Sequence, residues 1–415
     1  MAVDLTCEFI GIKLKNPFLI ASVPSAGSWG LARAAKAGWA GAIHWGAEPL
    51  GQRGAFYRGY IPREQDYIGK PPQWWSFENS CGPRDDVNPE QHLSPDRVEN
   101  IIRRAKESGI VVGCNVFEGA NPDAWTEVAQ AAERGGADFI ELNWSCPYFP
   151  ESGMEIGTDP ELRMSTMKAV RKGCSLPVMV KLNASLGSGM LAEAARGAVE
   201  AGADAISITN TMKGFVGVNI ETGVPLACEL CKDGKVRGMI GGISGPGIKP
   251  MGLRGVAEIR RAISVPISAI GGVDQWESAV EYMLMGATTI QVGTAVMLYG
   301  YKIVLGMIRG LEAYMERKGY KQITDFVGLT SDRYLVGEYV DPAEKQPRKM
   351  VINEEKCTGC GLCLVACQAS NESGALRVED KKARIDHKLC QTCNSCLIVC
   401  PEGAITVEWD PGYLK

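Results

Sequence analysis

The sequence predicts an α/β fold, in which a TIM-type (β/α)8 barrel is followed by a small α+β domain. Two observations lead to this prediction. From Pro17 to about Tyr314, short apolar runs alternate with stretches of helical length, which gives eight βα units in order. Beyond them, eight of the fifteen cysteines fall between positions 357 and 400. A doubly wound sheet is the alternative for the first part, but eight evenly spaced units favour a closed barrel.

The eight predicted strands are short apolar runs. They are Phe18–Ala21, Gly41–Trp45, Val111–Asn115, Asp138–Asn143, Val178–Leu182, Ala205–Thr209, Ile267–Ile270 and Thr289–Val292. Helices are predicted between them, at stretches that include Pro95–Ser108, Ala124–Arg134, Pro160–Arg171, Leu191–Ala201, Leu253–Ile263 and Gln275–Met285. Three of the helices end in a glycine turn, at Gly136, Gly202 and Gly286, and glycine suits the left-handed residue that closes a helix.

Two connections are too long for simple loops, Gly46–Ser94 after the second strand and Asn210–Lys249 after the sixth. Both follow the carboxyl ends of barrel strands, where barrel active sites form, so we expect them to build the substrate pocket. The charged stretch Ser331–Lys349 contains two prolines and reads as a linker. The predicted domains are therefore a barrel at 1–330, a linker at 331–349 and a cysteine-rich domain at 350–415.

The composition is that of a soluble globular protein, with 45% apolar and 22% charged residues among 415. A net charge of −4 gives no reason to expect nucleic acid or an anionic membrane as a partner. Met1–Glu8 lacks the apolar run of a signal peptide. The most apolar later stretch, Ala295–Ile308, is interrupted by Lys302 and is too short to span a bilayer. We therefore expect a cytoplasmic protein that binds neither nucleic acid nor membrane.

The clustered cysteines form two copies of one spacing, Cys-x2-Cys-x2-Cys-x3-Cys. Such a loop wraps three thiolates around one iron–sulfur cubane, and the fourth cysteine reaches the other cluster. The module is thus predicted to be ferredoxin-like, with two 4Fe–4S clusters. A pair of zinc knuckles is the alternative, but zinc has no use for the duplicated spacing. The predicted ligands are Cys357, Cys360, Cys363 and Cys400 for one cluster, and Cys390, Cys393, Cys396 and Cys367 for the other.

Glycine turns after the last two barrel strands predict a phosphate site, because glycine leaves backbone N–H groups accessible. Beside an iron–sulfur module they favour a flavin, which exchanges a hydride on one side and single electrons on the other. Lys181, at a strand end, would stabilise the anionic reduced flavin beside N1 and O2; a surface lysine is the alternative. The residues assigned to the flavin site are Lys181, Ser22, Thr209, Gly242, Gly271, Gly272, Gly293 and Thr294.

Polar side chains follow the fourth and sixth predicted strands. Asn143, Asn210 and Thr211 would present amide and hydroxyl groups to the barrel mouth, which suits a flat heterocycle with alternating C=O and N–H groups. Cys146 begins the loop after the fourth strand and is a candidate proton donor, although most lone cysteines are packing residues.

Together these residues resemble those of a known family. The segments Asn143–Pro147, Thr209–Thr211, Gly241–Gly245, Gly271–Gly272 and Gly293–Ala295 are similar to those of the dihydroorotate dehydrogenase-type flavin barrel. With the ferredoxin-like module behind the barrel, nearly the whole chain resembles the dihydropyrimidine dehydrogenase family, in particular its iron–sulfur/FMN catalytic subunit.

The resemblance implies FMN in the barrel and reduction of the C5–C6 double bond of uracil or thymine, with a hydride passing from flavin N5 to C6. Cys146 matches the family's general acid, which protonates C5 from a mobile loop. The two asparagines and the threonine match substrate-binding positions, Asn79 matches a further one, and Lys181 matches a flavin-contacting lysine. No independent dinucleotide-binding motif is visible, so the implied electron donor is an FAD/NAD(P)H-binding subunit in a homo- or hetero-oligomer.

Two departures from the family pattern bear on the substrate. His44-Trp45-Gly46 stands where the family has Thr-Lys-Thr, and Tyr148–Ser152 replaces a glycine-rich loop. The leading hypothesis is an FMN- and iron–sulfur-dependent reductase of a pyrimidine. The alternatives are the same flavin chemistry on another conjugated cyclic carbonyl compound, or an electron-transfer subunit with a catalytically silent barrel.

Overall fold

The computed structural model describes residues 3–44, 94–118, 121–146, 153–187, 189–230, 233–238, 240–334, 347–371 and 373–409, and the backbone of residues 56–60 and 74–78. The chain forms two compact units. The first comprises Met1–Gly59 and Trp74–Tyr334, and the second comprises Tyr60–Gln73 and Leu335–Lys415. Each unit is described by itself.

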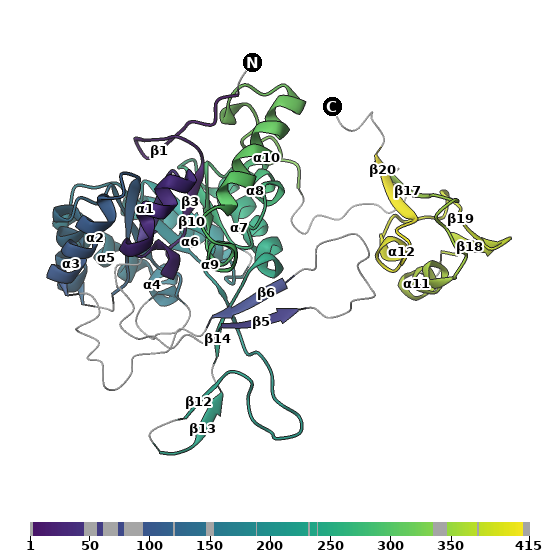
Figure 1. The fold of residues 1–415 in the computed structure, drawn as a ribbon, viewed down its shortest axis with the longest axis horizontal. Coiled ribbons are helices and arrows are strands. Elements are labelled where there is room, and N and C mark those ends of the chain that lie inside the picture. The colour runs from purple at the N-terminus through teal and green to yellow at the C-terminus, as the bar shows by residue number, and fades with distance from the viewer. Residues whose placement is uncertain are drawn as a thin grey trace. The chain divides into compact units, whose positions relative to one another are not determined.

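The first unit is a closed barrel of parallel strands (Figure 1), which confirms the predicted fold. Neighbouring strands pair in the order of the sequence, and Ile290 opposite Phe18 closes the ring. The predicted strand bounds agree with the observed ones to within two residues. The barrel strands are β3 Phe18–Ile20, β4 Gly41–His44, β7 Val111–Val116, β8 Phe139–Asn143, β9 Val178–Leu182, β10 Ala205–Ile208, β15 Ile267–Ile270 and β16 Thr289–Val292.

A ring of helices covers the barrel, and some of its members begin or end with recognisable caps. Helix α5 begins at Pro160, where the Asp159 carboxylate accepts backbone N–H bonds from the first turn. Helix α6 ends at Gly202, which has a left-handed φ of 113° as predicted. Among the described residues, the covering helices are α1 Ser28–Ala37, α2 Pro95–Lys106, α3 Pro122–Arg134, α5 Pro160–Gly173, α6 Met190–Ala201, α7 Lys249–Ala262, α8 Trp276–Leu284 and α10 Ile303–Lys318.

The two long connections share a second sheet, which the sequence analysis did not predict. Strands β5 Phe56–Tyr60 and β6 Trp74–Glu78 come from the first connection, and β11 Met212–Gly214 and β14 Gly241–Ser244 from the second. The connections join where β14 pairs with β6 in antiparallel fashion. The hairpin of β12 Cys228–Leu230 and β13 Val236–Gly238 projects from the second connection (Figure 1).

Smaller elements complete the barrel unit. An antiparallel hairpin, β1 Cys7–Phe9 and β2 Ile12–Leu14, packs its apolar side chains into the main core. Short helices α4 Met154–Thr158 and α9 Thr294–Tyr299 follow β8 and β16. Within the predicted linker, Tyr334 packs on the barrel, because its hydroxyl donates to Ala257 O on α7 at 2.5 Å.

The second unit is a small domain with two antiparallel strand pairs and two short helices (Figure 1). Its core contains few apolar side chains, and the cysteines themselves belong to it. So small a core gains stability from bound metal clusters. The elements are β17 Arg348–Ile352, α11 Leu362–Ser370, β18 Leu376–Glu379, β19 Lys382–Ile385, α12 Ser395–Ile398 and β20 Ile405–Trp409.

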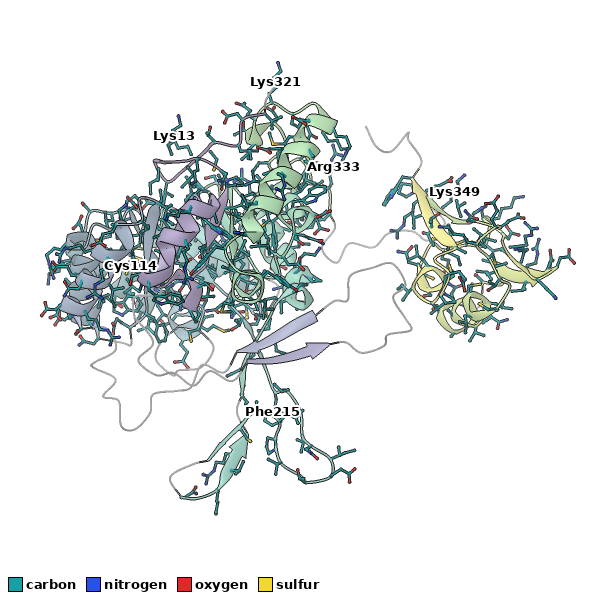
Figure 2. The ribbon with its side chains drawn as sticks, in the orientation of Figure 1. Lys13, Cys114, Phe215, Lys321, Arg333 and Lys349 are labelled. Atoms are coloured by element: carbon teal, nitrogen blue, oxygen red, sulfur yellow. The ribbon has the colours of Figure 1, made fainter. Side chains whose placement is uncertain are left out.

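The side chains of the barrel unit separate into a buried interior and an exposed arm. Cys114, labelled in Figure 2, lies fully buried on β7. Phe215, also labelled there, is 46% exposed and lies on the arm that leads to the β12–β13 hairpin. Because the interior is filled with side chains, we expect a ligand site at the carboxyl ends of the strands, where the two long connections begin.

Candidate active site

A buried ion pair occupies the inside of the barrel. Lys181 on β9 and Glu141 on β8 both point inward, and Lys181 Nζ lies 3.7 Å from Glu141 Oε1. The side chains are 5% and 0% exposed. The register explains the contact, because Asn143 lies opposite Lys181 and Glu141 is two residues before it on the same face of β8. Lys181 is therefore a buried, paired lysine and not the surface lysine that was the alternative.

Glu141 gathers further polar side chains from three other strands. Its Oε1 accepts a hydrogen bond from Asn115 Nδ2 at 2.8 Å. Its Oε2 accepts from Ser207 Oγ at 2.8 Å and from Gln291 Nε2 at 3.3 Å. Gln291 also donates to Ser268 Oγ at 3.0 Å. A charged residue on an otherwise apolar strand was the sequence signal for this network, but the sequence analysis gave Glu141 and Gln291 no role.

A pocket opens above this network at the carboxyl ends of the strands. Lys181 and Gln291 line it from the barrel interior. The segments that follow β3, β10, β14, β15 and β16 form its walls. Of the seven other residues assigned to flavin, five line it as well, namely Thr209, Gly271, Gly272, Gly293 and Thr294.

The remaining two flavin assignments lie beside the pocket and are not among its described lining residues. Ser22 precedes Val23, which does line it. Gly242 is on β14, paired with Lys213 of β11 and Glu78 of β6. Two residues further on, Ser244 lines the pocket and accepts a hydrogen bond from Thr294 Oγ1 at 2.8 Å.

The pocket fits a flavin phosphate and ring system in two respects. Gly272 has a φ of 71°, and a Cβ there would fall 2.9 Å from Gly245 O and 2.9 Å from Lys249 N, so the backbone of two loops meets where only glycine fits. Gln291 Oε1 is a buried acceptor without a hydrogen-bond partner in the described part of the chain. A heterocycle with N–H groups would satisfy such an acceptor.

A cluster of amide and hydroxyl groups adjoins this pocket, and two of its residues, Asn210 and Thr211, line the pocket. Asn210 Nδ2 donates to Ser145 Oγ at 2.9 Å and lies 3.4 Å from Asn143 Oδ1. Ser145 Oγ donates to Asn143 Oδ1 at 2.6 Å, and Thr211 N donates to Asn210 Oδ1 at 2.7 Å. The structure thus brings together the three polar residues predicted from separate strands. It adds Ser145, which the sequence analysis missed.

Asn183, also missed, ties the same loops together. Its Nδ2 donates to Ser145 O at 3.0 Å and to Thr211 O at 3.1 Å. Thr209 binds the residue after Asn183: its Oγ1 accepts a hydrogen bond from Ala184 N at 2.7 Å. The ends of β8, β9 and β10 therefore form one hydrogen-bonded unit.

Cys146 begins the loop after β8 and is partly exposed. Its carbonyl accepts a hydrogen bond from Met154 N at 3.0 Å, so the two ends of the intervening loop are held together. Gly153 is required at this closure, since a Cβ there would lie 2.3 Å from Cys146 O. Residues 147–152 lie outside the described residues, as do Asn79 and Trp45.

His44, at the end of β4, is completely buried. Its Nε2 accepts a hydrogen bond from Ser28 N at 3.2 Å, at the start of helix α1. An imidazole acceptor thus stabilises a helix N-terminus. The position that matches the family's lysine is the next residue, Trp45.

In the second unit the cysteines surround two separate hollows. Cys357, Cys360, Cys363 and Cys400 line one of them. Cys367, Cys390, Cys393 and Cys396 line the other. The fourth cysteine of each run therefore lies with the first three of the other run. Backbone N–H groups of Ala383 and Ala404 lie 3.4 Å from Cys357 Sγ and 3.3 Å from Cys400 Sγ, as donors to cluster thiolates do.

Each of the two units matches a known protein family. The family model for dihydroorotate dehydrogenase matches residues 4–315. The chain belongs to the dihydroorotate dehydrogenase family. A second family model, for the 4Fe–4S dicluster domain, matches residues 350–407.

Members of this family that resemble the chain are subunits of pyrimidine-converting enzymes. The NAD-dependent dihydropyrimidine dehydrogenase subunit PreA of Escherichia coli K12 is 32% identical over 378 residues, which cover 88% of this chain and 85% of PreA. The catalytic subunit of dihydroorotate dehydrogenase B from Methanocella arvoryzae is 33% identical, over 78% of this chain and 97% of that subunit. The corresponding subunit of Methanothermobacter thermautotrophicus is 36% identical over 52% of this chain and 67% of that subunit.

These matches confirm three predictions. The resemblance to the iron–sulfur/FMN subunit is confirmed, and the chain is an oxidoreductase of the class that acts on CH–CH bonds. The predicted cofactors, FMN and two 4Fe–4S clusters, are confirmed by the two family matches. Among the described residues no helix is both long and apolar enough to cross a bilayer.

Proposed function

We propose that this protein reduces the C5–C6 double bond of uracil or thymine to the 5,6-dihydropyrimidine. The observation that carries the proposal is the group of Asn143, Asn210 and Thr211 beside the pocket that Lys181 lines. Two amides and a hydroxyl match the alternating C=O and N–H groups of a pyrimidine. The likeness to PreA along most of the chain supports the same substrate class.

The proposed roles follow from the positions of the side chains. FMN would be held by Lys181, Thr209 and the glycine turns at Gly271–Gly272 and Gly293–Thr294, with Ser22 and Gly242 close by. When bound, FMN supplies a hydride from N5. Cys146 would give its thiol proton to C5 of the substrate as the general acid. The asparagines and Thr211, with Asn79 as a further predicted contact, would orient the ring.

The second unit would carry electrons to the barrel. We propose that the four cysteines around each hollow are the ligands of one 4Fe–4S cluster. The relatives are named as subunits, so we propose that an FAD/NAD(P)H-binding subunit donates the electrons within an oligomer. The cytoplasmic location stays a prediction.

Anaerobic turnover tests the substrate. The FMN-loaded protein with a chemical reductant should convert uracil or thymine, and added dihydropyrimidine should bleach the oxidised flavin. Orotate is the comparison, since two of the three relatives described above are named for dihydroorotate. If neither uracil nor thymine reacts and dihydropyrimidine leaves the flavin spectrum unchanged, the pyrimidine proposal is wrong.

The second candidate is the same flavin chemistry on another conjugated cyclic carbonyl compound. The replacement of the family's lysine by Trp45, next to the buried His44, favours it, because an aromatic ring in place of a cation changes the charge and the size of the side chain at that position. A panel of cyclic enones and imides, assayed with the same reductant, distinguishes the two. Turnover of a panel member without turnover of uracil or thymine would select the second candidate.

A further inference from the structure

The environment of Glu141 differs from that of an ordinary structural carboxylate. It is completely buried, and its four described polar partners come from four different strands: Asn115 on β7, Lys181 on β9, Ser207 on β10 and Gln291 on β16. Two of the partners, Lys181 and Gln291, also line the pocket. A change at Glu141 is therefore transmitted directly to two walls of the pocket.

We propose that Glu141 is a positioning residue that holds Lys181 against the flavin and sets the net charge felt there. The inference rests on the proposed placement of FMN beside Lys181. Glu141 itself is not among the described lining residues of the pocket, so it acts through Lys181 and Gln291. Its role concerns the reduction potential of the bound flavin and not the proton transfer at Cys146.

The sign of the effect follows from counting charges. With Glu141 and Lys181 together, the net charge of the pair is zero, so the developing negative charge of a reduced flavin meets a dipole and not a full cation. Without the carboxylate, Lys181 is an uncompensated cation in a region that water does not screen. Reduced flavin would then be favoured, and its midpoint potential would rise. Without the ammonium, Glu141 is an uncompensated anion, and the potential would fall.

The structure also suggests why the protein keeps this carboxylate. Lys181 has four flexible side-chain bonds, and its described partner at 3.7 Å restrains them. Glu141 is in turn fixed by three neutral donors, which leaves it few alternative positions. The carboxylate of Glu141 thus weakens the electric field of the Lys181 ammonium at the flavin, but it also fixes the position of that ammonium.

The test is a double-mutant cycle read out by potentiometry of the FMN-loaded full chain. Glu141→Gln is nearly isosteric and should raise the flavin midpoint potential by at least a tenfold change in the reduced-to-oxidised ratio, about 30 mV for a two-electron couple. Lys181→Met should lower it by a similar amount. The double variant, which restores a net charge of zero, should return close to the wild type.

Two controls separate charge from packing. Glu141→Asp keeps the charge and should stay within threefold of the wild type in that ratio. Ser207→Ala removes a neutral hydrogen bond of 2.8 Å to the same carboxylate. Its reduced-to-oxidised flavin ratio should also stay within threefold of the wild type. Sulfite addition to the oxidised flavin is a second readout, since a nearby cation strengthens it: Glu141→Gln should bind sulfite more tightly and Lys181→Met more weakly.

The outcomes are distinguishable. If Lys181→Met leaves the potential unchanged, the flavin does not lie against Lys181 and the proposed placement fails. If Lys181→Met lowers the potential but Glu141→Gln leaves it unchanged, only the role of Glu141 is overturned. If Glu141→Gln does not retain FMN, the effect of Glu141 is read from the flavin midpoint potentials of Lys181→Met and the double variant. Equal midpoint potentials for these two proteins would overturn the inference.

Discussion

Lys181 Nζ lies 3.7 Å from Glu141 Oε1 inside the barrel, with both side chains at least 95% removed from solvent. A buried ion pair contributes little net stability, because the cost of desolvating two charges offsets their attraction. Removing only one of the two charges is strongly destabilising, because the remaining charge stays buried without a counter-charge.

We therefore expect Lys181→Met to lower the free energy of unfolding of the apoprotein by about 3–5 kcal/mol. The double variant Lys181→Met/Glu141→Gln should recover most of that loss. Urea unfolding of the three proteins measures both effects. Lys249→Met is the control, because it removes an ion pair with Glu281 at the surface and should cost less than about 1 kcal/mol. Equal losses for Lys181→Met and Lys249→Met would contradict the argument.

Cys146→Ala should slow turnover by a factor of about 10²–10⁴, the usual contribution of a positioned general acid. Substrate binding should change little, because the described hydrogen bonds of Asn143 and Asn210 do not involve the thiol. Single-turnover oxidation of the reduced flavin by substrate measures the step. Cys228→Ala, on the hairpin away from the pocket, should leave the rate unchanged. A fully active Cys146→Ala variant would remove the general-acid assignment.

Gly272→Ala should weaken FMN binding at least tenfold. The added Cβ would lie 2.9 Å from both Gly245 O and Lys249 N, so the two loops that line the pocket would have to separate. Gly300→Ala is a matched control, because it has a similar positive φ of 78° but open space around its Cβ. Fluorescence titration of the apoprotein with FMN compares them. If both variants bind FMN equally, backbone strain and not the close approach of the loops explains any loss.

The barrel was predictable because its strands are apolar runs separated by stretches of helical length. The meeting of Asn143 and Asn210 was predictable too, since the carboxyl ends of parallel strands share one end of the barrel. The pairing of β14 with β6 was not, because it joins two distant connections that carry no periodic pattern. Glu141 was missed for a related reason: only the register that sets Asn143 opposite Lys181 shows what the carboxylate contacts.

The cysteine pairing makes a sharp prediction for the second unit. Cys400→Ser should lose the same cluster as Cys357→Ser, although Cys400 belongs to the other run in the sequence. Cys367→Ser should in turn match Cys390→Ser. Each variant should retain about four of the roughly eight iron atoms. Iron analysis and low-temperature electron paramagnetic resonance of the reduced proteins check this.

The matching control is Cys228→Ser, which lies in the barrel unit and should keep all the iron. If Cys400→Ser instead gave the same spectrum as Cys390→Ser, each run would hold its own cluster, and the crossed arrangement would be wrong.

Glu118 follows β7 at the barrel mouth, and burial raises the pKa of its carboxyl to about 7. Between its ordinary value of 4.5 and about 7, the folded protein binds more protons at this site than the unfolded chain. Stability contributed by the neutral carboxyl is therefore present at low pH and is lost as the pH rises through that window. The wild type should lose about 1–3 kcal/mol relative to Glu118→Gln on going from about pH 5 to about pH 8.

Urea unfolding at each pH measures the free energies of unfolding of the wild type and Glu118→Gln. Taking the difference between the two proteins at one pH cancels the contributions of all other titrating groups. Glu127→Gln, at an exposed position on α3, is the control and should show no such change between the two conditions. A constant difference between wild type and Glu118→Gln would mean that the carboxyl ionises in the folded protein as it does in water. Burial at the barrel mouth would then be too slight to favour the neutral carboxyl of Glu118.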